Sequence, residues 1–360
     1  MILTIFVAFF TLIFLIVLHE LGHFVLAKKF GVKVEEFGVG LPPRIFGKKF
    51  GETLYSLNWL PIGAFVRLYG EEKQEPGAES FSGKPIWQRA LIVGGGVISF
   101  WIIAVLVLTI MMGLGVPTPV SDTAGDDSLK NPQVQIIAIA PDSPAAAAGL
   151  KMGDAIKKLR WGGDTIKINR VSEVQEFMEG HRGEKVVIEF ARGGQVRETE
   201  VVPRFIPPEG EGPLGVALSR VALKTYPWWE APWRGIYATG MLTLNVILGW
   251  VYVFSNLFQG QPTGADVMGP VGIVTVFAQI TQMGLVYFLQ FVATISVYLA
   301  LFNVLPIPAV DGGKLFFLAL EAARKKPLPE KLEQSITAAF FFLIIGLMLF
   351  VTFRDITRLL

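Results

Sequence analysis

The chain has 360 residues, of which 52% are hydrophobic and 17% are charged, and its mean hydropathy is +0.52. A typical soluble domain carries about 25% charged residues, so this composition argues against a purely soluble protein. The net charge of +2 gives no sign of a nucleic-acid binder. The absence of cysteine excludes disulfides, thiolate metal sites and cysteine nucleophiles.

Long uncharged stretches divide the chain. Lys, Arg, Asp and Glu are absent from residues 1–18, 90–121, 235–265, 267–310 and 335–353. Because a helix crosses a bilayer with about 20 apolar residues, we expect an α-helical polytopic membrane protein. The four expected transmembrane helices cover residues 1–27, 87–114, 285–305 and 336–353. Residues 235–258 contain several Thr and Asn residues and follow three tryptophans, which favours a helix lying in the membrane interface.

The basic residues predict the orientation of the first span. No basic residue precedes Lys28, whereas a cleaved signal peptide has a positive segment before its apolar core. We therefore expect residues 1–27 to be a retained span whose N-terminus lies outside. Residues 28–89 hold ten Lys and Arg residues, which the positive-inside rule places in the cytoplasm.

Between the second and third spans the composition is that of a soluble domain. Alternating apolar residues and turn-rich segments predict short strands and one longer helix. The expected elements are strands at residues 134–140, 155–159, 186–191 and 196–202, and a helix at residues 172–179 with Ser172 as its N-cap. The expected organisation is an N-terminal membrane domain (1–120), an extracytoplasmic α+β domain (121–222), a linker with an interfacial amphipathic helix (223–284) and a C-terminal membrane domain (285–360).

The strongest chemical motif is His19-Glu20-Leu21-Gly22-His23, an H-E-x-x-H pattern. Positions i and i+4 of a helix share a face, so both imidazoles can bind one metal ion while Glu20 faces a metal-bound water. The alternative is a pair of interfacial histidines without a metal. Unpaired polar groups at the end of an apolar helix are costly to bury, however, and are usually functional.

A third metal ligand is needed, because a catalytic zinc ion usually takes three protein ligands and one water. His181 is a poor candidate, since it falls in the inserted domain. Asp311 is a better one, because it is the only charged residue in residues 267–313 and follows Pro306 and Pro308, which break the third span. Irregular backbone at membrane depth is tolerated only where protein or water surrounds it. The alternative for Asp311 is a loop carboxylate in ordinary contact with water.

Together these motifs resemble the site-2 protease family of intramembrane zinc metalloproteases, in its bacterial RseP-type branch. That family carries H-E-x-x-H in its first span and N-x-x-P-x-P-x-x-D-G in its third, which residues 303–312 match here. Residues 60–71 look like the family's membrane-associated β-hairpin, and residues 268–273 match the segment before its third span. The resemblance covers nearly the whole chain in the family's order.

The inserted domain resembles a PDZ domain of the permuted bacterial kind. The matching segments are residues 143–145, 148–151, 153–156 and 214–216. The alternative is a small α+β domain without a peptide ligand. The chain departs from the family in having one such domain, in Val310 before the aspartate, and in Gly95 to Phe100, which lack the family's usual proline and asparagine.

The resemblance implies a complete catalytic site. It implies that His19, His23 and Asp311 hold Zn²⁺ and that Glu20 is the catalytic base. It also implies substrate binding by Asn303, for which a structural role at the end of the helix is the alternative. An open hairpin edge near residues 54–68 would hold an unwound substrate by strand addition.

The implied function is hydrolysis of peptide bonds within transmembrane segments of single-span membrane proteins, such as anti-sigma factors or remnant signal peptides, in regulated intramembrane proteolysis. The implied partners are these substrates, membrane lipid and peptide termini at the PDZ-like domain. The implied location is a bacterial inner (cell) membrane, with the active site towards the cytoplasm. The alternatives are a non-catalytic PDZ membrane adaptor and a transporter that binds ions at Asp311. An adaptor should have lost one of the catalytic residues and a transporter should show inverted repeats, and the sequence shows neither.

Overall fold

The computed structural model describes residues 2–71, 73, 75–123, 131–261 and 268–359. Residues 124–130 of the predicted inserted domain and 262–267 of the predicted linker lie outside the described residues. The chain forms two compact units. The membrane unit comprises Met1–Leu108, Gly235–Ala278 and Phe291–Leu360, and the inserted unit comprises Thr109–Arg234 and Gln279–Gln290.

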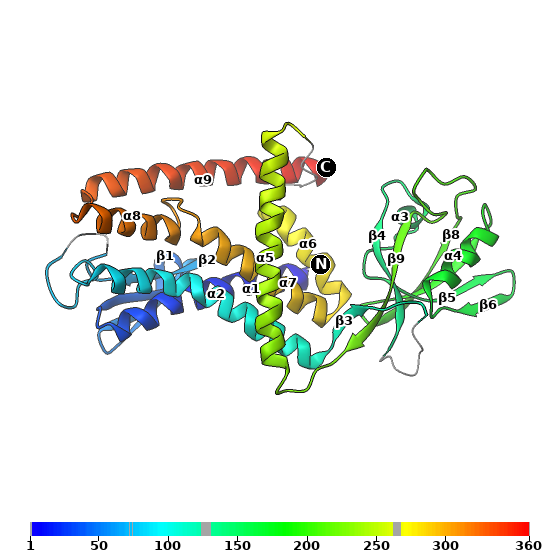
Figure 1. The fold of residues 1–360 in the computed structure, drawn as a ribbon, viewed down its shortest axis with the longest axis horizontal. Coiled ribbons are helices and arrows are strands. Elements are labelled where there is room, and N and C mark those ends of the chain that lie inside the picture. Colours follow the sequence, from blue (N-terminus) through cyan, green and yellow to red (C-terminus); the bar gives the residue numbers. More distant parts are fainter. Residues whose placement is uncertain (1, 72, 74, 124–130, 262–267, 360) are drawn as a thin grey trace. The chain divides into compact units, whose positions relative to one another are not determined.

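Helices make up most of the membrane unit (Figure 1). They are α1 (Ile2–Lys29), α2 (Ile86–Leu114), α5 (Ala231–Phe258), α6 (Pro270–Met283), α7 (Leu285–Val304), α8 (Asp311–Arg324) and α9 (Glu330–Leu359). Within the described residues, α1, α2, α5, α7 and α9 are each long and apolar enough to cross a membrane. The chain is therefore an integral, polytopic membrane protein that also carries a β domain.

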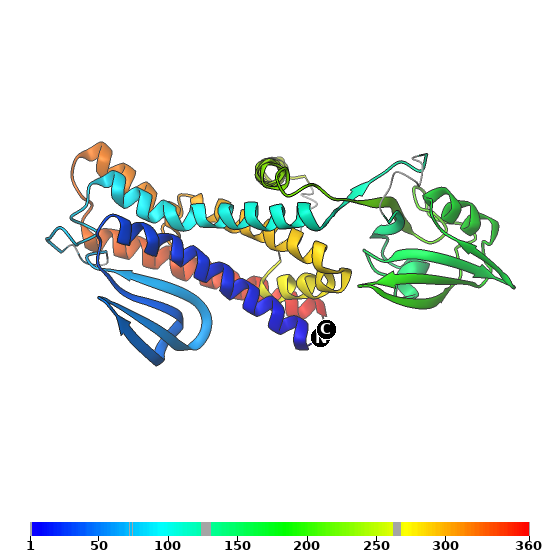
Figure 2. The ribbon, with the colours of Figure 1, turned by 90° about the horizontal axis from the view of Figure 1, so that it is seen from below.

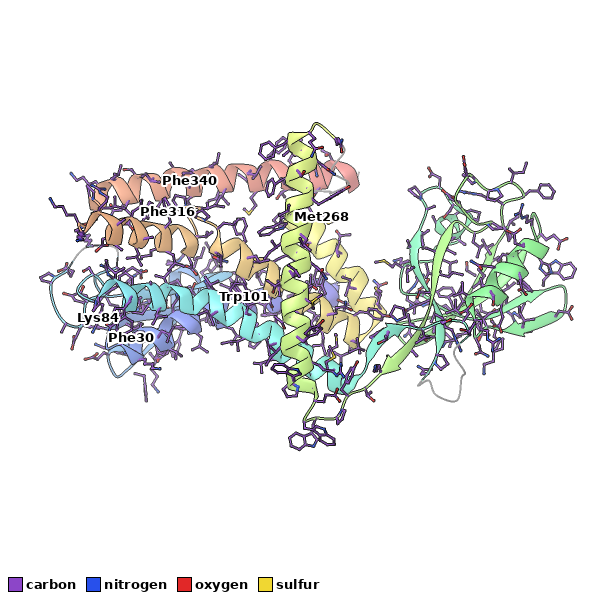
Figure 3. The ribbon with its side chains drawn as sticks, viewed as in Figure 1. Phe30, Lys84, Trp101, Met268, Phe316 and Phe340 are labelled. Atoms are coloured by element: carbon purple, nitrogen blue, oxygen red, sulfur yellow. The ribbon has the colours of Figure 1, made fainter. Side chains whose placement is uncertain are left out.

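Helix α5 differs from the other long helices in its direction. Helices α1, α2 and α9 extend along the long dimension of the membrane unit, whereas α5 runs across them (Figures 1 and 2). Trp101 on α2 lies beside α5 (Figure 3) and donates its indole N–H to the Thr243 hydroxyl at 3.2 Å. Trp250 of α5 packs against Tyr298 of α7, with ring centroids 6.4 Å apart. Helix α5 therefore lies against α2 and α7 without running alongside them.

A curled two-stranded sheet, β1 (Val34–Phe50) and β2 (Thr53–Leu68), follows α1. Residues 36–39 pair with residues 64–67 and also with residues 54–57, while residues 54–57 pair in addition with residues 46–49. The expected open edge at residues 54–68 is therefore wrong in its first part, because residues 54–57 have partners on both sides. The bend that produces this double pairing depends on contacts between distant residues, so a hairpin pattern does not reveal it.

Helix α6 is tied to the C-terminal end of α9. Asp355 is 7% exposed, and its Oδ2 accepts hydrogen bonds from the backbone N–H groups of Gly269 at 2.9 Å and Gly272 at 2.8 Å. A side chain at either glycine would crowd this carboxylate. The sequence singled out residues 268–273 only because they match a segment of the family. In the structure, two glycines of this segment bind the Asp355 carboxylate.

The inserted unit is built on a seven-stranded sheet in the order β3-β9-β4-β5-β7-β8, with β6 paired to β5. Its elements are β3 (Val116–Pro119), β4 (Gln133–Ile139), α3 (Pro144–Ala147), β5 (Ala155–Trp161), β6 (Asp164–Lys167), α4 (Val171–Gly180), β7 (Val186–Arg192), β8 (Gln195–Val201) and β9 (Val216–Lys224). Buried side chains such as Ile136, Ile156, Ile188 and Met178 form its core. The inserted unit is thus a β domain that also carries α3 and α4.

The predicted N-cap of α4 is wrong. Helix α4 begins at Val171, so Ser172 lies within its first turn. The capping group comes from Asp122, whose carboxylate accepts hydrogen bonds from the N–H groups of Val171 at 3.1 Å and Ser172 at 3.0 Å. A capping residue so far away in the chain cannot be recognised from the local pattern on which helix boundaries are predicted.

Candidate metal centre and catalytic site

The structure brings the three predicted metal ligands together. His19 Nε2 lies 3.3 Å from His23 Nε2 and 3.3 Å from Asp311 Oδ2, and His23 Nε2 lies 3.4 Å from the same oxygen. Both histidines are 8% exposed. Within the described residues, these side chains form the one group of metal-ligand type found close enough to share an ion.

Helix α1 supplies both imidazoles, one turn apart. The Nδ1–H of His23 donates to the backbone carbonyl of Ile92 on α2 at 2.9 Å. Because the proton is on Nδ1, the Nε2 lone pair of His23 is left for a metal ion. The ring of His19 stacks on Phe100 of α2, with centroids 4.6 Å apart and planes 19° apart. Helix α2 thereby orients both histidines.

Glycines allow α2 to lie directly against the histidines. A Cβ atom at Gly96 would be 2.2 Å from His23 Nε2 and 2.7 Å from a carbon of the His19 ring. A Cβ at Gly22 would be 2.3 Å from the carbonyl oxygen of Gly95. Real side chains do not come this close, so these positions require glycine. The stretch in which the family's proline is missing is therefore the surface that supports the metal ligands.

Asp311 is placed by the break between α7 and α8. Helix α7 ends at Val304, and Asp311 is the first residue of α8, where the helix dipole favours a negative charge. A Cβ at Gly312 would be 2.2 Å from the Leu305 carbonyl oxygen, and the equivalent distance at Gly313 is 2.3 Å, to another carbonyl of the same loop. The two glycines thus let the loop fold back on α8 and direct the aspartate towards α1.

A metal ion fits this arrangement. Asp311 Oδ2 is buried and has no hydrogen-bond donor among the described residues, while the Nε2 atoms of His19 and His23 surround it. Lone pairs facing one another at this distance need a cation between them. In a tetrahedral zinc site with bonds of about 2.0–2.1 Å, ligand atoms lie about 3.3–3.4 Å apart. The three observed separations match that spacing.

Glu20 lines a cavity that has a volume of about 910 Å³. His19, Asp311 and Asn303 also line it. The Glu20 carboxylate lies against the backbone N–H of Val66 in β2. Within the sheet, residues 64–67 pair on one side only, with residues 36–39. The open part of the sheet edge therefore passes next to the predicted base.

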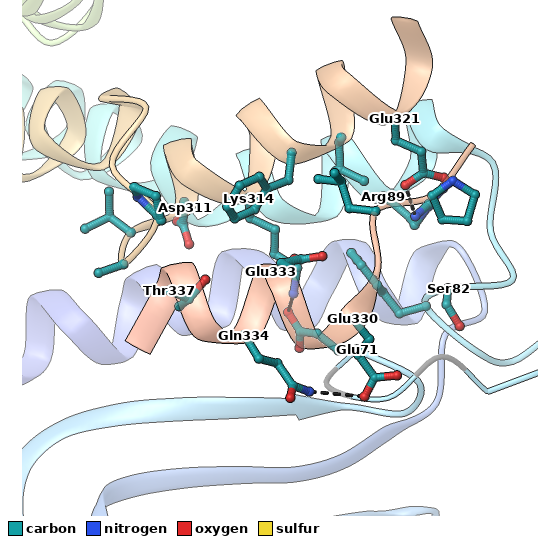
Figure 4. A pocket seen from close by; sticks show the side chains of 18 of the residues that line it. Glu71, Ser82, Arg89, Asp311, Lys314, Glu321, Glu330, Glu333, Gln334 and Thr337 are labelled. Carbon is teal, nitrogen blue, oxygen red and sulfur yellow. Dashed lines mark hydrogen bonds and ion pairs between the residues drawn. The ribbon is translucent and has the colours of Figure 1, made fainter. Parts of the chain in front are cut away.

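Ion pairs between helices lie in the cavity wall (Figure 4). The sequence did not predict them. Arg89 of α2 makes two hydrogen bonds to Glu321 of α8, at 3.0 and 2.6 Å. Lys314, one turn after Asp311, pairs with Glu71 next to the sheet and lies 4.9 Å from the ring centre of Phe81. These contacts join α8 to α2 and to the end of β2. The partners are far apart in the chain, so a single sequence gives no signal that pairs them.

Two further predictions concern polar residues outside the metal triangle. Asn303 lines the cavity, and its Nδ2 donates to the carbonyl of Leu299, one turn earlier in α7, at 2.9 Å. This is the structural helix-end contact named as the alternative for Asn303. His181 lies in the inserted unit, where its Nδ1 bonds to the Phe177 carbonyl at 2.7 Å and its ring packs against Trp161. It is not among the grouped metal-ligand side chains.

Comparisons with known proteins agree with this site. The model of "Peptidase family M50" matches residues 7–347. A relative from Clostridium perfringens is 32% identical over 343 residues, covering 95% of each chain. Proteins named zinc metalloprotease RasP from Geobacillus kaustophilus and Shouchella clausii are each 26% identical, covering 96% and 98% of this chain and 95% and 98% of their own. With the family match extending over nearly the whole sequence, the chain belongs to peptidase family M50.

Proposed function

We propose that this protein is an intramembrane zinc peptidase that hydrolyses peptide bonds within the transmembrane segments of single-span membrane proteins. The observation that carries the proposal is the triangle of His19, His23 and Asp311, because His19 and Asp311 line a cavity among helices that are long and apolar enough to cross a membrane. Glu20 opens into the same cavity. A peptidase needs this combination to bring water and a metal ion to a bond inside a bilayer.

In the proposed mechanism, His19, His23 and Asp311 hold zinc. When bound, zinc polarises the scissile carbonyl and lowers the pKa of a coordinated water. Glu20 takes the proton from the attacking water and returns it to the leaving nitrogen. Its position next to His19 on α1 directs the carboxylate into the cavity where the substrate must enter. The other cavity residues hold the polypeptide around this reaction.

Substrate presentation requires an unwound segment, because the carbonyl of a helical peptide bond already accepts a hydrogen bond. We propose that the substrate adds as a strand to the open edge of β2, at residues 64–68. Two observations support this assignment: those residues pair only with β1, and the N–H of Val66 lies against Glu20. Strand addition would then bring the substrate backbone beside the catalytic base.

Asn303 is proposed to contact the substrate backbone as well. One amide hydrogen of its side chain is used by Leu299, which fixes the side-chain orientation. The carbonyl oxygen and the second amide hydrogen are then available on the cavity side. An amide held in this way can both donate to and accept from an extended backbone.

The proposed topology has four spans, with α5 in the outer interface. The first turn of α1 and the last turn of α9 lie at the same end of the membrane unit, as an even number of crossings requires (Figure 2). The direction of α5 across α2 and α9 also supports the proposal. So do three exposed interfacial tryptophans at its start, Trp228, Trp229 and Trp233. The inserted domain would then be extracytoplasmic, and the metal would lie towards the cytoplasm.

We further propose that the inserted domain is PDZ-like and acts as a size filter above the membrane. Its combination of a β-sheet with α4 supports that fold, and its insertion between α2 and α5 ties it to two membrane helices. A folded domain in that position excludes substrates with bulky outer parts. Substrates already shortened, including remnant signal peptides or anti-sigma factors, would pass.

The function is tested by reconstituting the purified protein with a model single-span substrate in lipid vesicles. We expect about one zinc ion per chain and cleavage products whose new ends fall within the substrate's transmembrane segment. A chelator should stop cleavage, and added zinc should restore it. Cleavage that persists in metal-free protein, or that occurs only outside the membrane segment, would contradict the proposal.

A further inference from the structure

Strand β9 is paired on both of its edges. Strand β4 pairs with its first part, from Val216 to Val221, and β3 pairs with its last part, from Val221 to Lys224. The residue after β3 continues the ladder, because the N–H of Val120 donates to the carbonyl of Arg220 at 2.9 Å. On the edge opposite β4, residues 220–224 of β9 are thus paired with a segment that follows the end of α2, while residues 216–219 have a strand partner only in β4 among the described residues.

The sequence of this segment closes the edge to further strands. Since the N–H of Val120 faces β9, strand alternation makes the N–H groups of Thr118 and Val116 face β9 as well. The backbone nitrogens of Pro117 and Pro119 then point to the outer side of β3, away from β9. Because proline has no N–H group, neither residue can donate a hydrogen bond there. A peptide cannot build a normal ladder on the outer side of β3. It can pair with this part of β9 only by replacing β3.

The segment is also fastened to α4. Asp122 caps the first turn of that helix through Val171 and Ser172. Arg220 of β9 is 1% exposed, and it donates to the carbonyls of Ser121 at 3.0 Å and Asn169 at 2.9 Å. A buried guanidinium therefore holds the segment to both β9 and the residues that precede α4.

We propose that residues 116–122, here called the strap, are a built-in occupant of the β9 edge at residues 220–224, beside the start of α4, and that an extended peptide pairs with this part of the edge only when the strap leaves it. The strap competes because it runs antiparallel to β9 and uses the same backbone groups that an added peptide would use. This inference does not depend on the peptidase reaction.

The first test uses the absence of cysteine from the chain. Pro117 and Leu223 are directly opposite in the β3–β9 ladder, at a pair that exchanges no backbone hydrogen bonds and whose side chains therefore lie closer together, so P117C/L223C should form a disulfide in the full-length protein under mild oxidation. The matched control P117C/R197C places the second cysteine on β8, at the far edge of the same sheet, and should not cross-link. Failure of the first pair to cross-link, or equal cross-linking of both, would show that the strap does not occupy the edge.

The second test measures competition with a fluorescent synthetic peptide that has the sequence of residues 116–123. Wild-type protein and the oxidised P117C/L223C protein should bind it weakly. V120P/D122A removes the N–H that bonds to Arg220 and the cap on α4, and should bind at least tenfold more tightly. S121A, which keeps the carbonyl used by Arg220, should behave as wild type. Equal binding by all four proteins would overturn the proposal.

A third measurement does not rely on the released variant being folded. Excess unlabelled peptide should slow disulfide formation in reduced P117C/L223C, because it takes the place of the strap on β9. A scrambled peptide of the same composition should not slow it. An unchanged cross-linking rate at peptide concentrations that saturate V120P/D122A would exclude competition for this edge, and so would absence of saturable binding by a V120P/D122A protein with native-like circular dichroism.

Discussion

A methyl group at residue 96 would overlap both histidines, so the metal site depends on a residue that binds nothing itself. Gly96 and Gly95 let α2 touch α1, and Ile92 fixes the proton of His23 from the same helix. Gly312 and Gly313 position Asp311 in a similar way, because they leave room for the carbonyl groups of the preceding loop to pack against α8. The geometry of the three ligands is thus set by small residues packed against them, while H-E-x-x-H alone provides only the donor atoms.

We predict that G96A weakens metal binding by about 10- to 100-fold, as is typical when the groups that orient metal ligands are disturbed. The added carbon would displace the imidazole of His23. The control is G94A, since a Cβ at Gly94 meets no atom within 4 Å. Zinc titration of the two purified variants measures the difference. Equal affinities would show that α2 does not constrain the ligands.

We predict that E20Q retains zinc but lowers the cleavage rate by about 10²- to 10⁴-fold, because it removes the base and leaves the ligands in place. H23A should lose zinc and activity together, and D311A should do the same. Metal content and cleavage are measured on the same preparations. Near wild-type cleavage by E20Q would reject Glu20 as the base.

At the scale of secondary-structure elements, sequence patterns predict the features that depend on neighbouring residues, such as a helix face or a helix end. The i, i+4 spacing of His19 and His23 and the prolines before Asp311 correctly indicate a shared helix face and a broken span. The curl of β1–β2 was not predicted, since it arises when residues 54–57 find partners on both sides. The length and apolarity of α5 resemble those of the other long helices, so they do not reveal its different direction. Its preceding tryptophans and its polar residues favour an interfacial helix, which stays a prediction. Ion pairs such as Arg89–Glu321 join residues 232 positions apart, so no local pattern reveals them.

The open edge of β2 yields a prediction at this scale. V66P removes the N–H that lies against Glu20 and should lower cleavage by about tenfold, the equivalent of one backbone hydrogen bond. Because this N–H points away from β1, proline should be accepted there without loss of the sheet. V66A keeps the N–H and serves as the control. If V66P and V66A cleave at the same rate, the substrate does not use this edge.

At the scale of the whole molecule, most basic residues at helix ends support the proposed orientation, and Arg354 and Arg358 near the end of α9 are the exceptions. Lys28, Lys29 and Arg89 end or begin helices at the metal end of the membrane unit, and Arg324 and Lys331 belong to α8 and α9 near the same cavity. The positive-inside rule favours the cytoplasm for that end, in agreement with the proposed topology of four crossings with α5 outside.

This topology is tested with single cysteines in the cysteine-free chain. Q259C lies just after α5 and K326C just after α8, and both parent residues are exposed. Position 259 is preferable to Gly260, whose φ of +66° disfavours a side chain. An impermeant thiol reagent added to intact cells should label Q259C and spare K326C, whereas both should react after lysis. The reverse pattern would exclude the four-span arrangement.

The hydrogen bonds of Asp355 have a consequence for chain connectivity. They join residues 86 positions apart, so α7, α8 and most of α9 lie within a loop whose two ends are held together without a covalent bond. A backbone cut between α8 and α9, at residues 325–329, would leave the C-terminal fragment attached at its far end. We therefore expect that two separately expressed fragments, 1–326 and 327–360, reassemble into one complex, and that a single D355A change separates them.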